Sequence, residues 1–218
     1  MNLVQMLFVE RPLKNVYIGE YNTPPSTYQQ VEWIQSSGTQ YIDTWFIPSN
    51  TTKIEISMWW WSALQQFQTL FWARQAWSST GKWFVLGYNT QYMYYAMFNK
   101  AIDIQTMVLS FIDGNNYIIQ MSKDGIYQNW TKKYTFTSAT FTSPVSMSLF
   151  AMNDNWTVKE QWAFKMYYTK IWSNGTLVRD FIPCYKTSNN EIWLFDKVEN
   201  KFYANSWTWT FTKWPDVN

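Results

Sequence analysis

Histidine is absent from the 218 residues of this chain, and cysteine occurs only once, at Cys184. The absence of histidine removes the commonest metal ligand and the commonest general base of enzymes. A single cysteine precludes an intramolecular disulfide and a zinc site built from several cysteines. Because Cys184 lies in an apolar stretch with no histidine to activate it, we expect a small buried side chain rather than a nucleophile.

Charge is also sparse, since charged residues make up 15% of the chain and the formal net charge is +2. The lysines and arginines are scattered, so no basic stripe predicts binding to nucleic acid. No apolar run reaches the roughly 18 residues that a membrane span requires. The first residues lack the basic start of a signal peptide. We therefore expect neither nucleic-acid binding nor membrane insertion.

Glycine is missing from turn positions that favour it. The chain has seven glycines and 16 tryptophans, although glycine usually makes up about 7% of a protein. Asn129-Trp130 and Asn155-Trp156 each separate two alternating apolar runs, where a tight hairpin needs positive φ and prefers Asn-Gly. Tryptophan adopts that conformation only at a steric cost. Other turns of the chain keep the expected glycine: Asp113-Gly114, Asp124-Gly125 and Asn174-Gly175.

These positions suggest the hypothesis that a glycine codon of the source organism has been translated as tryptophan. UGA is the obvious candidate, because some bacterial lineages read it as glycine whereas a common translation table reads it as tryptophan. The hypothesis covers nine positions: Trp45, Trp72, Trp77, Trp130, Trp156, Trp193, Trp207, Trp209 and Trp214. If it holds, they should lie at turns, bulges and loop tips, with few in the core. The alternative is a genuinely tryptophan-rich surface that binds carbohydrate.

Aromatic residues make up 21% of the chain, and aromatic and β-branched residues favour strands. Short alternating runs separated by turn residues predict strands at 40–44, 53–58, 69–73, 82–87, 92–98, 105–112, 117–122, 146–152, 164–171, 177–185, 191–195 and 201–204. No window shows the apolar stripe of a helix. The expected fold is all-β, a two-sheet antiparallel β-sandwich of jelly-roll type with its two ends in neighbouring strands.

The pattern also predicts domain boundaries and a core. Residues 1–27, which end in the stiff segment 23–26, are expected to form an N-terminal arm or linker, and residues 28–218 the domain. Alternate positions of the expected strands should face inward: Ile42, Ile54, Ile56, Leu70, Leu86, Leu109, Ile119, Leu149, Met166, Ile171, Leu177, Phe181 and Leu194.

Three linked motifs, the last of them in two segments, suggest a family. Residues 31–44 read VEWIQSSGTQYIDT, residues 70–74 read LFWAR, and the segments 170–185 and 191–202 read KIWSNGTLVRDFIPCY and EIWLFDKVENKF. Together they resemble the laminin-G-like, concanavalin A-like jelly-roll domains of bacterial surface proteins and phage tail or virion proteins. The resemblance implies a non-catalytic binding or adhesion module on a cell or virion surface, outside the cell.

Four charged residues of these motifs are candidates for a specific role. Asp43 precedes a tight turn, where aspartate caps backbone N–H groups; because some laminin-G-like domains bind calcium, a calcium ligand is the alternative, and no other cofactor is expected. Arg74 is expected either to satisfy loop carbonyls or to face a ligand. Arg179 and Asp180 are expected to form a buried or half-buried pair that fixes the last strands.

An aromatic hairpin offers a candidate ligand site. Tyr88, Tyr92 and Tyr94 flank the polar Asn89 and Gln91. Aromatic faces beside amide side chains suit sugars, because the ring packs on the apolar face of the sugar while the amides meet its hydroxyls. The alternative for these tyrosines is ordinary packing within a sheet.

An enzyme is disfavoured by the spacing of the carboxylates. Retaining glucanases need two carboxylates about 5–5.5 Å apart, which on one strand face requires even spacing. Glu191 and Asp196 are an odd number of residues apart, and Glu55 stands alone. We expect a binding module for glycans or surface proteins, with a structural part of a phage tail or larger surface protein as the alternative and a polysaccharide hydrolase disfavoured. The sequence specifies neither the ligand nor the number of subunits.

Overall fold

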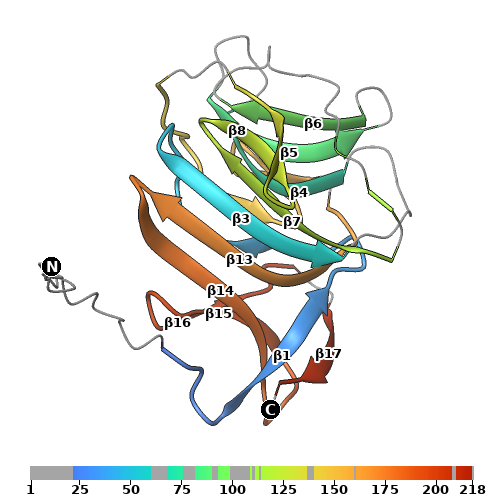
Figure 1. Cartoon of the computed structure of the whole chain (residues 1–218). Helices are drawn as coiled ribbons and strands as arrows, with labels where there is room; N and C mark the ends of the chain where they lie inside the picture. The colour runs from blue at the N-terminus through green and yellow to red at the C-terminus, as the bar shows by residue number, and fades with distance from the viewer. Residues whose placement is uncertain are drawn as a thin grey trace, which may run out of the picture.

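The computed structural model describes residues 22–59, 68–75, 82–89, 93–98, 109, 111–112, 114–136, 140–159, 161–207 and 210–217. These residues form strands and turns, and they contain no helix, and hence none long and apolar enough to span a membrane. Two sheets pack on each other as a β-sandwich (Figure 1). The prediction of an all-β sandwich is therefore confirmed.

The larger sheet has ten strands, in the order β16-β15-β14-β1-β13-β3-β7-β8-β9, with β17 paired to β1. Its strands are β1 (Tyr28–Gln35), β3 (Thr52–Trp59), β7 (Asn116–Ser122), β8 (Gly125–Gln128), β9 (Thr131–Tyr134), β13 (Lys165–Ser173), β14 (Thr176–Lys186), β15 (Ile192–Asp196), β16 (Lys201–Ala204) and β17 (Thr212–Asp216). Every pairing in this sheet is antiparallel.

The smaller sheet has seven strands, in the order β12-β11-β4-β10-β2, with β5 paired to β4 and β6 paired to β5. Its strands are β2 (Ile42–Asp43), β4 (Gln68–Arg74), β5 (Trp83–Asn89), β6 (Met93–Phe98), β10 (Ser148–Leu149), β11 (Met152–Asp154) and β12 (Thr157–Lys159). One pairing departs from the expected antiparallel pattern, because β11 runs parallel to β4. The expected strand 146–152 is broken into β10 and β11 at Phe150, where φ is +67°.

Buried and half-buried residues alternate strictly along β3, and this alternation shows most clearly which strand face forms the core. Ile54, Ile56 and Met58 are fully buried, whereas the residues between them are only half-buried. Of the residues expected to face inward, all except Leu177 are buried; Leu177 is half-buried near the start of β14. The registers inferred from the alternation are therefore correct, since a shift of one residue would have exposed each set.

The ends of the domain lie together. The last strand is β17, not the expected strand 201–204, and it pairs with β1 through Val31 and Trp33. Figure 1 shows the two strands side by side, β1 in blue and β17 in red. The segment before β1 is also attached, because Asn22 donates its Nδ2–H to the carbonyl of Lys197 at 2.9 Å. Residues 1–21, most of the expected arm, lie outside the described residues, as does most of the expected strand 105–112.

We expect Ile56→Ala to destabilise the domain by about 2–5 kcal/mol, because truncating a fully buried isoleucine loses apolar burial and leaves a cavity. Urea unfolding followed by circular dichroism measures the difference in free energy. Ser57→Ala, on the opposite face of β3, is the matched control and should change stability little. Equal losses in both variants would contradict the assigned register.

Candidate functional site

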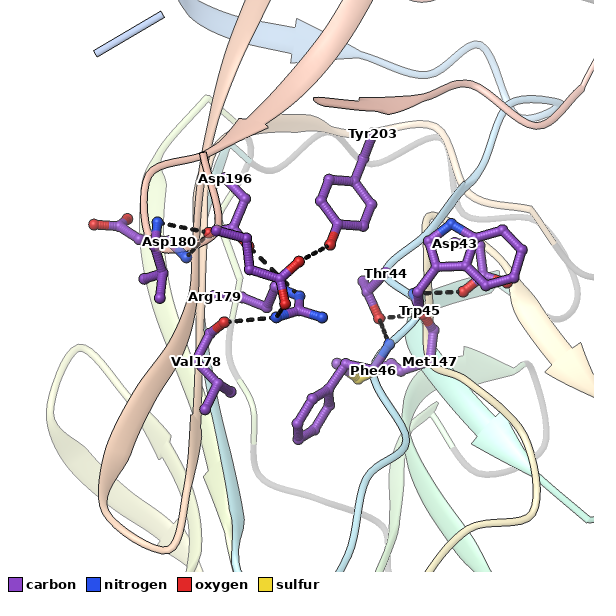
Figure 2. A network of polar contacts seen from close by, with 12 residues as sticks. Asp43, Thr44, Trp45, Phe46, Met147, Val178, Arg179, Asp180, Asp196 and Tyr203 are labelled. Atoms are coloured by element: carbon purple, nitrogen blue, oxygen red, sulfur yellow. Dashed lines mark hydrogen bonds and ion pairs between the residues drawn. The ribbon is translucent and has the colours of Figure 1, made fainter. Parts of the chain in front are cut away.

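Asp43 organises a tight turn. Its Oδ1 accepts the backbone N–H of Trp45 at 2.8 Å, and its Oδ2 accepts the hydroxyl of Ser146 at 2.9 Å. Thr44 extends the turn, since its hydroxyl donates to the carbonyl of Met147 at 2.7 Å and accepts the N–H of Phe46 at 3.2 Å (Figure 2). Within the described part of the chain, no group of three or more acidic, cysteine or histidine residues surrounds a metal position. The two hydrogen bonds of Asp43 fit its expected capping role, and the calcium alternative stays a prediction.

Arg179 lies at the centre of a second polar network, which joins β14 to β15 and β16 (Figure 2). Its guanidinium forms ion pairs with Glu199 and, at 3.5 Å, with Asp196. The hydroxyl of Tyr203 donates to Glu199 at 2.8 Å. Asp180 is buried as expected, but the carboxylates that pair with Arg179 come from β15 and the turn that follows it. The expected pairing of Arg179 with its neighbour is therefore wrong, because successive residues of a strand point to opposite faces.

Asp196 is the most deeply buried charge of this network, with no exposed surface. Its Oδ1 accepts the N–H groups of Asp180 at 2.9 Å and Val198 at 3.0 Å. Burial raises the pKa of Asp196, while these two N–H groups and the Arg179 guanidinium oppose the rise. A carboxylate closed off from solvent in this way closes a turn and has no access to a substrate.

Arg74 has a structural role, as the charged partner of Asp154. It is 7% exposed, and its Nε–H and Nη2–H donate to the two carboxylate oxygens of Asp154 at 3.0 and 2.7 Å. The guanidinium also lies about 5 Å from the ring centroids of Trp72 and Trp83, at 5.0 and 5.1 Å. Arg74 and Asp154 are register partners in the parallel pairing of β4 with β11. A bidentate ion pair at this point holds β11 against β4.

The expected aromatic hairpin does not form a ligand site at Tyr88. This side chain is 7% exposed and belongs to the main hydrophobic core, which agrees with the alternative of sheet packing. Gln91 and Tyr92 lie outside the described residues. Asn89 and Tyr94 belong to β5 and β6, but the positions of their side chains also lie outside what the structure describes.

A polar pocket of about 340 Å³ lies where three turns of the larger sheet meet. Its volume is at the lower end of the range for small-ligand sites. The pocket is lined by the residues leading into β3, by the β7–β8 turn and by the β13–β14 turn: Asn50, Thr51, Thr52, Lys53, Ser122, Lys123, Asp124, Asn174 and Gly175. Hydroxyl, amide, ammonium and carboxylate groups therefore surround one concave space. Spacing within the sequence carried no signal of this site, because its three segments are far apart along the chain.

The outer face of the larger sheet continues from this pocket. Lys53 lines the pocket and lies 4.7 Å from the ring centroid of Trp172. Glu55, the next outward residue of β3, accepts hydrogen bonds from the hydroxyl of Tyr168 at 3.0 Å and from the amide of Gln120. At the far end of β3, Lys165 lies 4.1 and 4.4 Å from the ring centroids of Trp33 and Trp59.

These residues form one surface, the β3 face, which we define as Lys53, Glu55, Trp59, Gln120, Lys165, Tyr168 and Trp172, together with Trp33. Most of these side chains are half-buried, with ordered partners in β1, β7 and β13. Aromatic rings and hydrogen-bonding groups alternate along it.

Comparison of the chain with protein-family models, with curated proteins and with solved structures found no match. The function is therefore inferred from the residues themselves.

Arg179→Met is expected to destabilise the domain by about 3–5 kcal/mol at pH 7, because it removes the charged partner of a buried carboxylate. A further rise in the pKa of Asp196 makes the native state bind a proton more tightly than the unfolded state. Stability then falls as pH rises through the range between the two pKa values. The loss should therefore be smaller at pH 4 than at pH 7 in urea unfolding. Arg179→Lys retains a positive charge and should therefore lose less stability. A loss of stability that does not depend on pH would refute the assignment of Arg179 as the charged partner of Asp196.

Cys184 is expected to resist alkylation in the folded protein. The residue is fully buried, and burial raises the pKa of its thiol to about 12, so the thiolate is scarce at pH 8.5. Mass spectrometry after treatment with iodoacetamide should show an unmodified protein under native conditions and complete modification in urea. Rapid modification of the native protein would contradict the burial of this strand.

Proposed function

We propose that this domain is a non-catalytic binding module that recognises glycans on a cell or virion surface, with the polar pocket and the adjoining β3 face as the ligand site. The observation that carries the proposal is their continuity through Lys53, which lines the pocket and also covers the ring of Trp172. Sugars are bound by such combinations, because rings meet their apolar faces while amides, hydroxyls and charges meet their hydroxyl groups.

The charges of the pocket favour an acidic glycan. Lys53 and Lys123 contribute two positive charges, whereas Asp124 contributes one negative charge. A sugar that carries a carboxylate would pair with the two ammonium groups, and its hydroxyls would meet Asn50 and Ser122. Neutral glycans would lose this pairing and are expected to bind more weakly.

The engagement of Asp196, Glu199 and Glu55 in other contacts supports a role without catalysis. Asp196 and Glu199 share the Arg179 guanidinium, and Asp196 is fully buried. Glu55 is held by Tyr168 and Gln120. A glycosidase needs one carboxyl group as a proton donor and a second as nucleophile or base, both exposed to the substrate, and neither set matches that arrangement.

A glycan array followed by calorimetry tests the proposal. The wild-type protein should bind acidic glycans reproducibly, and Lys53→Ala and Lys123→Ala should each weaken binding by about tenfold, the equivalent of one charge-assisted hydrogen bond. Lys201→Ala, on the distant edge strand β16, removes the same charge and should bind as the wild type does. Circular dichroism verifies that each variant is folded.

The outcomes separate the candidate functions. A blank array together with a stable oligomer in solution would overturn the proposal in favour of a structural part of a phage tail or larger surface protein. Binding that is equal in the pocket variants and in the control would overturn the assigned site.

A further inference from the structure

The tryptophans in the left-handed region of backbone conformation are the strongest anomaly of this molecule. Among the described residues other than glycine, positive φ occurs at five asparagines, at Phe150 and at three tryptophans. The tryptophans are Trp45 at +53°, Trp130 at +62° and Trp156 at +70°. Asparagine tolerates this region, but a bulky side chain there is a genuine outlier. All three tryptophans belong to the nine for which the sequence suggested a glycine codon.

A glycine-containing hairpin of the same chain serves as a reference for the turns at Trp130 and Trp156. Asn174-Gly175 joins β13 to β14, with φ of +50° and +78°. Asn129-Trp130 joins β8 to β9 with φ of +47° and +62°, and Asn155-Trp156 joins β11 to β12 with +52° and +70°. The three hairpins therefore have the same length, the same first residue and the same pair of left-handed conformations, and they differ only in glycine against tryptophan.

Packing does not compensate for the strain at the tryptophans. Phe150 also has positive φ, but its ring is fully buried and stacks on Phe164 at 4.4 Å between centroids. In contrast, the three tryptophans are 65, 67 and 64% exposed in the order Trp45, Trp130 and Trp156. A large apolar side chain at these positions combines an unfavourable backbone with an unfavourable exposure to water.

Among the described tryptophans, strong exposure occurs only in the suspected group. Every exposed tryptophan of the described residues belongs to the nine, since Trp207 and Trp214 are 54 and 70% exposed. Outside the nine, the described tryptophans are buried or half-buried: Trp33, Trp59, Trp83, Trp162 and Trp172. The separation follows the sequence hypothesis, which used no information on exposure.

Not all of the nine lie where the hypothesis placed them. Trp72 is 2% exposed within β4, Trp193 is half-buried within β15, and Trp214 lies within β17. The expectation of turns, bulges and loop tips is wrong for these three. Trp77 and Trp209 lie outside the described residues. The backbone argument therefore rests on Trp45, Trp130 and Trp156.

We propose that Trp45, Trp130 and Trp156 are glycines in the native protein, specified by UGA codons that a glycine tRNA of the source organism reads. Glycine populates positive φ without a steric penalty, and it removes three large apolar side chains from the surface. The inference is independent of the glycan site, because none of the three residues belongs to the pocket or to the β3 face.

The coding DNA and the native protein test the inference directly. We expect TGA at all three positions and TGG at Trp83 and Trp162, which are buried in the described core. Peptides of the protein isolated from its source should have the mass of glycine at positions 45, 130 and 156. TGG codons or tryptophan-containing native peptides at these positions would overturn the proposal.

Stability measurements on the tryptophan-containing chain provide a second test. Trp130→Gly and Trp156→Gly should each raise the folding equilibrium constant about fivefold or more, because both relieve a left-handed bulky residue. The matched reverse change is Gly175→Trp, which should lower the constant by a similar factor; a Cβ at Gly175 meets no atom within 4 Å, so the effect comes from the backbone. Trp162→Gly, in the core, should lower it strongly. If Trp130→Gly and Trp156→Gly both lost stability, the inference would be wrong.

Discussion

The right-handed twist of paired strands restricts how this chain can turn, and much of the structure depends on that restriction. A two-residue hairpin that follows the twist through a type I′ turn has positive φ at both central residues. The hairpins β8–β9, β11–β12 and β13–β14 all obey this requirement. Two of them extend the edges of the sheets, and the third sets the register of the two longest strands. The third turn also lines the polar pocket, so the same constraint shapes both the fold and the candidate site.

Long-range polar contacts stabilise the regions of the fold whose strands are not joined by these two-residue hairpins. Strand β11 follows β10 closely in sequence, yet it pairs parallel to β4, which is a less stable pairing for each residue. The bidentate contact of Arg74 with Asp154 stabilises that pairing. Arg179 does the same for the turn between β15 and β16, where Asp196 binds two backbone N–H groups. In both places an arginine neutralises a carboxylate that the fold has removed from water.

The alternation of apolar residues predicted many of the strands and most of the core, because one face of each strand must be buried while the other need not be. β1 was not among the expected strands. β3 is the clearest example, since its pattern specified both its extent and its inward residues. The turn residues predicted the hairpins for the same local reason. Strand β17 was missed because the segment from Asn205 to Pro215 resembles a flexible tail, and its pairing with β1 depends on residues almost two hundred positions away.

Contacts between distant segments could not be predicted from local sequence patterns, for the same reason. The partner of Arg74 is 80 positions away, and the partners of Arg179 could be recognised only after β14, β15 and β16 were in register. The pocket required three turns from separate parts of the chain. Tyr88 of the aromatic hairpin faces the core, and a run of tyrosines does not reveal which of them face inward.

The positions of the aromatic residues bear on both proposals. A sugar-binding platform needs several rings on one continuous surface. The three exposed tryptophans with positive φ do not provide one, because Trp130 and Trp156 lie on hairpins of different sheets and Trp45 lies on the loop after β2. The half-buried rings of Trp33, Trp59 and Trp172 share the outer face of the larger sheet, where Lys53 and Lys165 lie over them. The proposed glycan site therefore uses tryptophans outside the nine, and replacing Trp45, Trp130 and Trp156 with glycine would remove exposed apolar surface that lies outside that face. Trp214 differs from these three, because it is the register partner of Trp33 and borders the face.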